Sequence, residues 1–220
     1  MPKGKFLLFL RKFVHMLSMW DERYRQTEGV YGREANPFWA AELANCKGQS
    51  LLLPCEGEGR NAVWAAQQGW NVHAFDSSGV GVETMKKWSH EAGVVVQAEQ
   101  ADAFEFKGNP GGYDVVGLFY AHMPAHQRQA FHARAIQWLS PGGTLILEAF
   151  HADQLGLSSG GPQNVEMLFS ESRLRSDFKE LSIQQCERVE TELDEGPFHQ
   201  GPAVLMRMIG TKSSHKDPLL

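Results

Sequence analysis

Residues 50–62, Ser-Leu-Leu-Leu-Pro-Cys-Glu-Gly-Glu-Gly-Arg-Asn-Ala, restrict the possible folds of this chain more than any other stretch. The leucines of 51–53 form a short apolar run, which predicts a buried strand. Gly57 and Gly59 follow, and residues 61–68 have the alanine-rich composition of a helix. A strand, a glycine turn and a helix N-terminus form a cradle for an adenine nucleotide, because glycine lets a ligand approach the backbone and the first N–H groups of a helix are unpaired.

Two further features support a nucleotide site. Residues 57–62, Gly-Glu-Gly-Arg-Asn-Ala, fit the dinucleotide fingerprint G-x-G-x-x-G/A. Asp76 ends the next predicted strand, 71–75, about twenty residues beyond the glycines, where a carboxylate can accept both ribose hydroxyls. Two plainer interpretations stay open. The turn is one that binds no ligand, or Asp76 caps the next helix, although Ser77 and Ser78 could cap it equally well.

The bulk composition narrows the class of protein. A chain of 220 residues suggests one domain. The formal net charge is -5 and the basic runs are short, which argues against nucleic acid as the main partner. No stretch reaches the roughly 18 consecutive apolar residues of a membrane span, so no membrane partner is expected.

The cysteines and histidines indicate neither disulfides nor a metal site. Cys46, Cys55 and Cys186 show no C-x-x-C spacing, and an odd number of cysteines disfavours a disulfide framework. A reducing, cytoplasmic setting is therefore expected. His126 and His132 show no H-E-x-x-H pattern, so no zinc site is expected.

Hydrophobic patterns predict the remaining elements. We expect strands at Val94–Val96, Tyr113–Tyr120 and Thr144–Phe150, a turn at 140–143, helices at 80–92 and 124–138, shorter helices starting at Pro37 and after Ser170, and a terminal hairpin of 179–193 and 203–210. Strands that alternate with helices predict a doubly wound α/β sheet, mostly parallel, with right-handed crossovers. The last strand should run antiparallel, because a short hairpin joins only antiparallel strands.

Polar residues follow two of these strands, at the edge where parallel sheets bind ligands. Asp102, after the third strand, either faces an adenine amino group or is a solvated turn residue. His122, after the fourth, is either a base near the ligand or a histidine with a structural role.

Composition also assigns the flanking segments. The aromatic side chains of 20–46 either form a lid over the ligand or pack against the outer face of the domain. The Gly- and Ser-rich loop 151–162 is expected to border the substrate. We expect an N-terminal helical lid or extension at 1–48, one α/β domain at 49–211 and a disordered tail at 212–220.

With these residues in hand, the chain resembles a class I S-adenosylmethionine-dependent methyltransferase, and within that class the tellurite-resistance type. The matching pieces are Trp20-Asp-Glu-Arg-Tyr24, Tyr31-Gly32, Gly57-x-Gly-Arg-Asn61, Asp76, Ser140-Pro-Gly-Gly143, and the segment from Phe169-Ser-Glu to Gly196-Pro-Phe-His199. They span most of the chain.

The resemblance implies a Rossmann-like, seven-stranded sheet with an antiparallel last strand, and S-adenosylmethionine as the cofactor. The residues that it places around the cofactor are Glu56, Gly57, Gly59, Asn61, Asp76, Ser77, Asp102, Ala103 and Tyr120. It places Arg60 and His199 against the methyl acceptor, and His122 is the other candidate base.

The sequence departs from the family pattern at three positions. Leu53 stands where the family usually has an acidic residue, and Cys55 replaces the usual first glycine. Gln200 stands where a basic residue often follows the hairpin histidine. Either Glu56 or Glu58 is expected to supply the missing carboxylate. These departures argue against tellurite as the natural acceptor more than against the cofactor.

The expected activity is in-line methyl transfer to a small molecule such as a thiol or an oxyanion. Arg60 would attract an anionic nucleophile, and His199 would orient the nucleophile or take its proton. An NAD-dependent oxidoreductase would use the same glycine turn, but it usually needs a second half that completes the dinucleotide site. A protein that binds S-adenosylmethionine without catalysis is the third interpretation.

Overall fold

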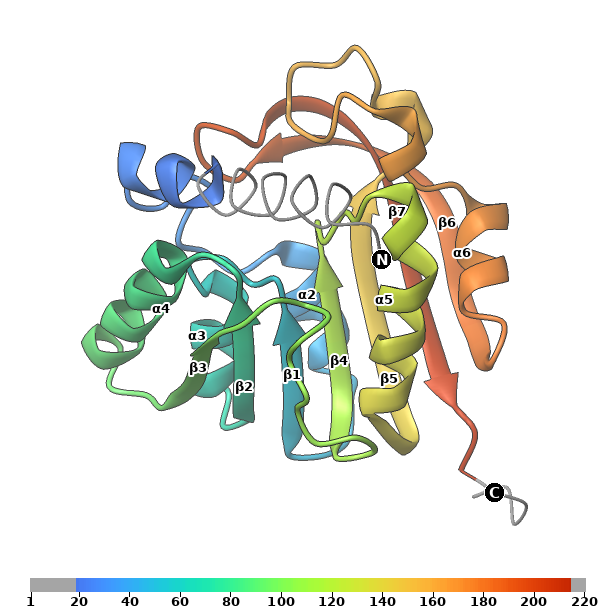
Figure 1. Cartoon of the computed structure of the whole chain (residues 1–220), viewed down its shortest axis with the longest axis horizontal. Helices are drawn as coiled ribbons and strands as arrows, with labels where there is room; N and C mark the ends of the chain where they lie inside the picture. The colour runs from blue at the N-terminus through green and yellow to red at the C-terminus, as the bar shows by residue number, and fades with distance from the viewer. Residues whose placement is uncertain (1–18, 215–220) are drawn as a thin grey trace, which may run out of the picture.

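A seven-stranded sheet runs through the computed structural model, which describes residues 19–214 (Figure 1). The strands are β1 Ser50–Pro54, β2 Asn71–Asp76, β3 Val96–Gln100, β4 Tyr113–Phe119, β5 Leu139–Phe150, β6 Leu181–Asp194 and β7 Gln200–Lys212. The helices are α2 Pro37–Leu43, α3 Arg60–Gln67, α4 Gly79–Glu91, α5 Ala125–Trp138 and α6 Glu171–Asp177, with 3-10 turns η1 Ala152–Gln154 and η2 Val165–Met167. Residues 19–26 are also helical.

The strand order is β3-β2-β1-β4-β5-β7-β6. Strands β1 to β5 pair in parallel, while β7 is antiparallel to both of its neighbours, β5 and β6. This arrangement confirms the predicted doubly wound α/β sheet with an antiparallel last strand.

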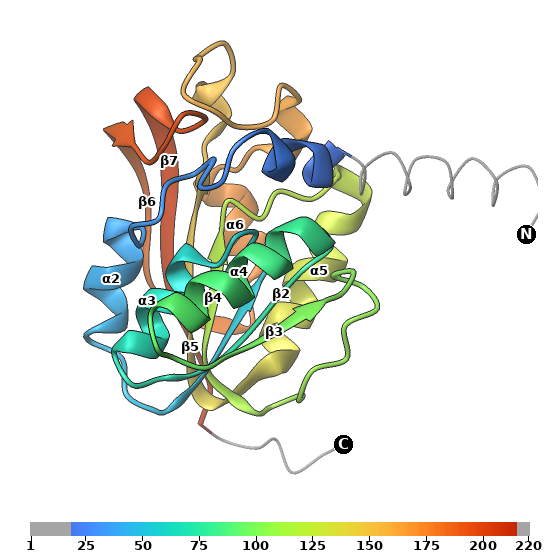
Figure 2. The same ribbon diagram turned by 90° about the vertical axis from the view of Figure 1, so that its left-hand side faces the viewer.

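Two helical layers cover the sheet (Figure 2). Leu52 of β1 packs in the cluster that contains side chains of α5 and α6, whereas Leu51 and Leu53 pack in the cluster that contains side chains of α2, α3 and α4. All three leucines are fully buried, because successive side chains of a strand point to opposite faces and both faces are covered. Leu53 is therefore a core residue of the α2–α4 side.

The predicted helix starts are confirmed by their caps. The side chain of Asn36 accepts a hydrogen bond from the N–H of Trp39, and Pro37 occupies the first helical position of α2. Ser170 caps α6 and Ser78 caps α4 in the same way.

The structure corrects three sequence-based boundaries. The third strand is Val96–Gln100, not Val94–Val96, and Val95 is 88% exposed. The expected turn 140–143 lies within β5, as a bulge in its pairing with β4. Tyr113 pairs with Leu139 and Val115 pairs with Thr144, so residues 140–143 have no pairing partner in the register of β4. In each case backbone pairing with a neighbouring strand, rather than local composition, sets the boundary.

The third correction concerns the end of the terminal hairpin. Strand β7 continues to Lys212, beyond the predicted end of the hairpin, and the Lys212 Nζ donates hydrogen bonds to the carbonyls of Ile136 and Leu139. A cation at the C-terminal end of α5 is favourable, because the last carbonyls of a helix lack intrahelical partners. The predictions for residues 1–18 and for the tail from 215 lie outside the described residues. Within residues 19–214, no helix combines the length and the apolar character that a membrane crossing requires.

A buried ion pair ties α6 to α5. Asp177 accepts hydrogen bonds from the Arg128 Nε at 2.6 Å and from the His132 Nδ1 at 2.9 Å, and its side chain is 1% exposed. Burial alone would raise the pKa of Asp177, but the hydrogen bonds from His132 and Arg128 lower it to about 2. His132 therefore has a structural role.

We expect Asp177→Asn to lower the free energy of unfolding by about 3 kcal/mol at pH 7, because it leaves buried donors without their charged partner. The difference should shrink as the pH falls from about 5 to about 2, since the wild-type carboxylate becomes protonated over that range. Urea unfolding at several pH values measures both effects. Glu171→Gln, which breaks the exposed pair with Arg175, is the control and should change the free energy of unfolding far less. A pH-independent difference for Asp177→Asn would contradict this account.

Candidate active site

The candidate site lies at the carboxyl ends of β1, β2 and β4, at the top of the sheet in Figure 1. Three segments that are far apart in the sequence gather above this edge: the helical residues 19–26, the loop 151–162 and the hairpin tip 195–199 (Figure 1). Ligands of open parallel sheets bind at such an edge.

The glycine turn after β1 needs residues with left-handed backbone. Gly57 has φ 62° and Gly59 has φ 90°, and a Cβ on Gly57 would lie 2.5 Å from the hydroxyl oxygen of Tyr24. Cys55, which stands in place of the first glycine, also has a left-handed φ of 56°. A side chain in this conformation costs about 1 kcal/mol or more, so the turn geometry is retained at some expense in stability.

Asp76 is buried at the end of β2. Its Oδ2 accepts a hydrogen bond from the N–H of Gly57 at 2.9 Å, and its Oδ1 accepts one from the N–H of Ser78 at 2.8 Å. Burial raises the pKa of Asp76 to about 6, although these hydrogen bonds oppose the shift. Each oxygen keeps a lone pair, so the carboxylate can still accept hydrogen bonds from a ribose. Ser78 is the helix cap, so Asp76 is not needed for that role.

The two glutamates of the turn point to different partners. The Glu56 Oε1 accepts hydrogen bonds from the N–H groups of Asn61 and Ala62 at the start of α3. Glu58 instead accepts hydrogen bonds from the N–H groups of Gly29 and Val30, at 2.8 and 3.0 Å. Of the two candidates for the missing carboxylate, only Glu56 therefore keeps its side chain at the turn. Burial raises the pKa of Glu56 to about 7, against the effect of its hydrogen bonds.

Asp102 and Ala103 lie just beyond the end of β3. The Asp102 Oδ1 accepts a hydrogen bond from the N–H of Phe104, and Ala103 is buried against the core. Ser77, next to Asp76, accepts a hydrogen bond from the Gln100 side chain through its carbonyl. These residues form the β2–β3 side of the site.

Residues 19–35, which we call the N-terminal strap, close the site from above. Asp21 accepts a hydrogen bond from the Ser78 hydroxyl at 2.5 Å, and the buried Tyr24 lies against the glycine turn. Phe38 and Trp39, by contrast, pack in the core on the α2–α4 side of the sheet. Phe38 and Trp39 therefore follow the packing interpretation, whereas a lid formed by the aromatic residues of the strap stays a prediction.

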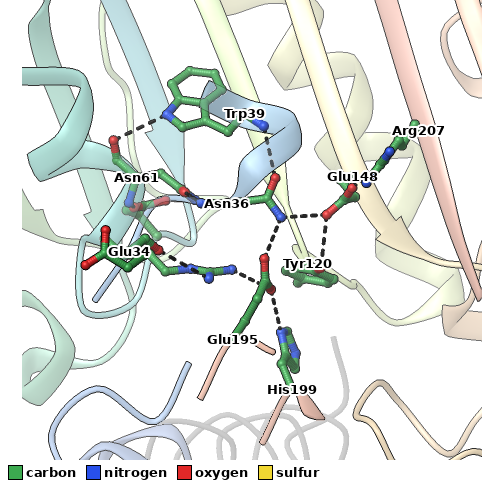
Figure 3. Close-up of polar contacts among 11 residues, drawn as sticks. Glu34, Asn36, Trp39, Asn61, Tyr120, Glu148, Glu195, His199 and Arg207 are labelled. Atoms are coloured by element: carbon green, nitrogen blue, oxygen red, sulfur yellow. Dashed lines mark hydrogen bonds and ion pairs between the residues drawn. The ribbon is translucent and has the colours of Figure 1, made fainter. Parts of the chain in front are cut away.

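The hairpin tip adds a buried carboxylate that the sequence analysis missed. Glu195 accepts a hydrogen bond from the Arg60 Nη2 at 2.9 Å, another from the Asn36 side chain at 2.9 Å, and faces the His199 Nδ1 at 3.3 Å (Figure 3). All four residues are nearly buried. Arg60 and His199 are therefore buried members of one cluster.

Asn36 connects this cluster to a second carboxylate. Its amide also donates to the Glu148 Oε1 at 2.6 Å, and Glu148 in turn binds the Arg207 Nε at 2.6 Å and the Tyr120 hydroxyl at 3.0 Å (Figure 3). The Asn61 side-chain oxygen accepts a hydrogen bond from the N–H of Asn36. The amide of Asn36 thus donates to two buried carboxylates.

Aromatic rings surround His199. Its ring centroid lies 4.4 Å from that of Tyr31, 4.4 Å from that of Tyr120 and 5.3 Å from that of Phe150. The Nδ1 faces Glu195, and the Nε2 makes no hydrogen bond within residues 19–214. Burial lowers the pKa of His199, although Glu195 opposes this. The imidazole is therefore neutral at pH 7, with its Nε2 lone pair available.

The two ring nitrogens of His122 are both occupied. The Nδ1 contacts the carbonyl oxygen of Met167 at 2.8 Å, and the Nε2 accepts a hydrogen bond from the N–H of Phe150 at 3.2 Å. Burial lowers the pKa of His122 to about 4. This geometry favours the structural interpretation of His122 over the role of a base. Within residues 19–214, no group of three or more His, Cys, Asp or Glu side chains is arranged to bind a metal.

The residues that the sequence analysis did not assign to the site come from segments without a motif of their own. Glu195, Glu148 and Asn36 meet only because the hairpin, β5 and the start of α2 converge. The one available signal was the position of Glu195 four residues before His199, which becomes a contact only once the turn is formed.

Comparisons with known proteins agree with this geometry. Residues 53–143 match the model of a methyltransferase domain family. A search of the curated proteins finds no match. Among solved structures, the fold is similar to that of a protein described for the conversion of a disulfide bond into a thioacetal group during echinomycin biosynthesis, with a TM-score of 0.73, 17% identity, and 92% of this chain and 95% of that chain covered.

Two further solved structures share the fold. TehB from Haemophilus influenzae aligns with a TM-score of 0.66 and 14% identity over 88% of this chain and 67% of that chain. Magnesium protoporphyrin IX methyltransferase from Synechocystis, solved with bound S-adenosylmethionine, aligns with a TM-score of 0.59 and 18% identity over 80% of this chain and 75% of that chain. The match over residues 53–143 is to a methyltransferase domain, and the whole sheet has the fold of these methyltransferases. The comparisons support S-adenosylmethionine as the cofactor, as predicted.

The residues at this edge fit that cofactor. Asp76 offers carboxylate lone pairs for ribose hydroxyls, and Asp102 at the next strand end is the residue predicted to face the adenine. Glu56 places a carboxylate at the turn where a methionine ammonium group would need one. We therefore propose these three residues as the cofactor contacts.

We expect Asp76→Asn to weaken S-adenosylhomocysteine binding at least tenfold, because an amide replaces a charged acceptor. Wild-type affinity should fall as the pH drops below about 7, where Glu56 becomes protonated, and again below about 6, where Asp76 does; the variant should show only the first fall. Calorimetric titration between pH 5 and pH 8 measures both. Glu105→Gln, an exposed position beyond β3, is the control and should bind like wild type. Equal affinities for Asp76→Asn and wild type would remove Asp76 from the site.

Proposed function

We propose that this protein is an enzyme that methylates a protic nucleophile, such as a thiol or a hydroxyl group, on a small molecule. The observation that carries the proposal is the Glu195–His199 pair, which presents an unoccupied imidazole nitrogen beside Tyr120 at the end of β4. A nitrogen of this kind is what a general base requires.

The proposed chemistry divides between cofactor and protein. When bound, S-adenosylmethionine would supply an electrophilic methyl carbon, and the C–S bond would break to release S-adenosylhomocysteine as the acceptor bonds to that carbon. Asp76 and Asp102 would hold the nucleoside, and Glu56 would hold the methionine end. His199 faces the acceptor, because its ring lies among the aromatic side chains beyond the glycine turn.

In this mechanism His199 removes the acceptor proton. The Glu195 carboxylate keeps the Nδ1 protonated, which leaves the Nε2 as the basic atom. As the acceptor forms its bond to the methyl carbon, its proton moves to Nε2, and Glu195 stabilises the resulting imidazolium. The lowered pKa of His199 keeps the base neutral at physiological pH.

Arg60 is a positioning residue in this proposal. Its guanidinium donates to Glu195, and both side chains are at least nine-tenths buried, so its charge is already neutralised. Attraction of an anionic nucleophile by Arg60, as the sequence suggested, would require this ion pair to break. The proposal therefore assigns Arg60 to Glu195 and not to the acceptor.

The enclosing segments support a small acceptor. The N-terminal strap, the hairpin tip and the loop 151–162 all lie above the strand ends and leave His199 only 4% exposed. A macromolecular acceptor would have to displace these segments. The cysteines Cys46, Cys55 and Cys186 are free thiols, which supports the expected cytoplasmic location.

The experiment that tests the cofactor part of the proposal is calorimetric titration with S-adenosylmethionine, S-adenosylhomocysteine and NAD. We expect both sulfur compounds to bind and NAD not to bind. Methyl transfer to thiol and phenol probes then distinguishes an enzyme from a protein that only binds the cofactor. Binding of NAD alone would instead support the interpretation as an NAD-dependent oxidoreductase.

We expect His199→Gln to lower kcat for such a probe by about 10²- to 10⁴-fold, the usual contribution of a general base. Its affinity for S-adenosylhomocysteine should stay within about twofold of wild type. The acid limb of the wild-type pH profile should lie below pH 6.5, because burial lowers the pKa of His199. His126→Gln, an exposed histidine of α5, is the control. Full activity in His199→Gln would exclude His199 as the base.

A further inference from the structure

Arg23 joins the N-terminal strap to the hairpin tip. Its Cζ lies 5.0 Å from the ring centroid of Trp20 and 5.2 Å from that of Phe198, so two aromatic rings contact the guanidinium. Its Nη1 donates a hydrogen bond to the hydroxyl oxygen of Tyr31 at 2.8 Å. These contacts hold a half-buried cation in one orientation.

The hydrogen-bond partners of Arg23 differ from those of every other arginine in residues 19–214. The others donate to carboxylates or to backbone carbonyls. Arg23 does neither in this part of the chain, and the Tyr31 hydroxyl takes only one of the five N–H donors of its guanidinium. A fixed cation with spare donors can bind a ligand anion without first breaking an ion pair.

Tyr31 places Arg23 at the proposed acceptor site. Its hydroxyl contacts Arg23, and its ring lies 4.4 Å from the ring of His199. Phe198, which contacts Arg23, is also the residue immediately before His199. The cation and the proposed base therefore border the same region, and aromatic rings lie between them.

We propose that Arg23 binds a carboxylate on the methyl acceptor while His199 faces the nucleophile, so that the substrate class is a small aromatic carboxylic acid with a thiol or hydroxyl group. This inference rests on the proposed function. The planar fork of a guanidinium matches a carboxylate, and the rings of Trp20, Tyr31 and Phe198 favour a flat apolar body. Arg60 cannot bind the carboxylate of the acceptor, because its guanidinium is already paired with Glu195.

The test uses two matched pairs of probes, 4-mercaptobenzoate with 4-mercaptobenzamide and 4-hydroxybenzoate with 4-hydroxybenzamide. Production of S-adenosylhomocysteine gives kcat/KM for wild type, Arg23→Gln and Arg23→Lys. We expect wild type to prefer at least one acid over its amide by tenfold or more, and Arg23→Gln to lose that preference. Arg23→Lys should keep part of it, because the charge remains but the fork is lost.

Arg25→Gln is the matched control, since Arg25 lies on the same helical segment and makes an exposed pair with Asp21. It should retain the wild-type preference. The melting temperature and the affinity for S-adenosylhomocysteine are measured for each variant, because Arg23 also connects the strap to the hairpin. A loss of activity on acid and amide alike in Arg23→Gln would mean that Arg23 only holds these segments together, and it would overturn the proposal.

Calorimetric titration of the S-adenosylhomocysteine complex with the same acids separates this inference from the proposed function. Acid binding that Arg23→Gln abolishes and His199→Gln preserves would support the role of Arg23, even if no probe is methylated. If neither acid binds or reacts in preference to its amide, Arg23 does not recognise a carboxylate. In that case, cofactor binding and methylation of the neutral probes still decide the proposed function.

Discussion

The buried carboxylate of Glu195 is the interaction on which the acceptor side of this protein depends. It receives donors from α3, from the residue before α2 and from its own hairpin, so three distant segments share one charge. Burial alone would raise the pKa of Glu195, but the hydrogen bond with His199 and the charge and hydrogen bond of Arg60 lower it to about 2. A buried charge is tolerated only when it is paired in this way, and removal of one partner leaves the others uncompensated.

The two glutamates of the turn after β1 bind different parts of the chain. Glu56 turns back to the start of α3, whereas Glu58 reaches outward to the backbone of the strap. Because the strap carries Tyr24, Tyr31 and Arg23, the Glu58 contact helps to position side chains that border the proposed cofactor and acceptor sites. A short glycine turn thereby holds residues on both sides of the proposed site.

Much of this fold could be predicted from local patterns. The sequence predicts the alternating strands and helices, the helix starts at Asn36 and Ser170 and the terminal hairpin, because each depends on residues close in sequence. The start of the third strand was predicted at Val94 instead of Val96. A β-branched run predicts a strand, but here it begins in the connection between α4 and the edge strand β3. Residues 140–143 have the composition of a turn, but the pairing with β4 on either side of them makes them a bulge within β5.

The sequence by itself determined the class of the domain and the cofactor edge, because the glycine turn and Asp76 lie within one strand–helix–strand unit. It also identified His199 and Arg60 as residues of interest, through the family resemblance. Only the tertiary structure decided what those residues contact. It pairs Arg60 with Glu195, occupies both nitrogens of His122 and, among residues 19–214, leaves Arg23 with spare donors. Hydrogen-bond partners from distant segments exist only after the sheet and the hairpin have brought those segments together.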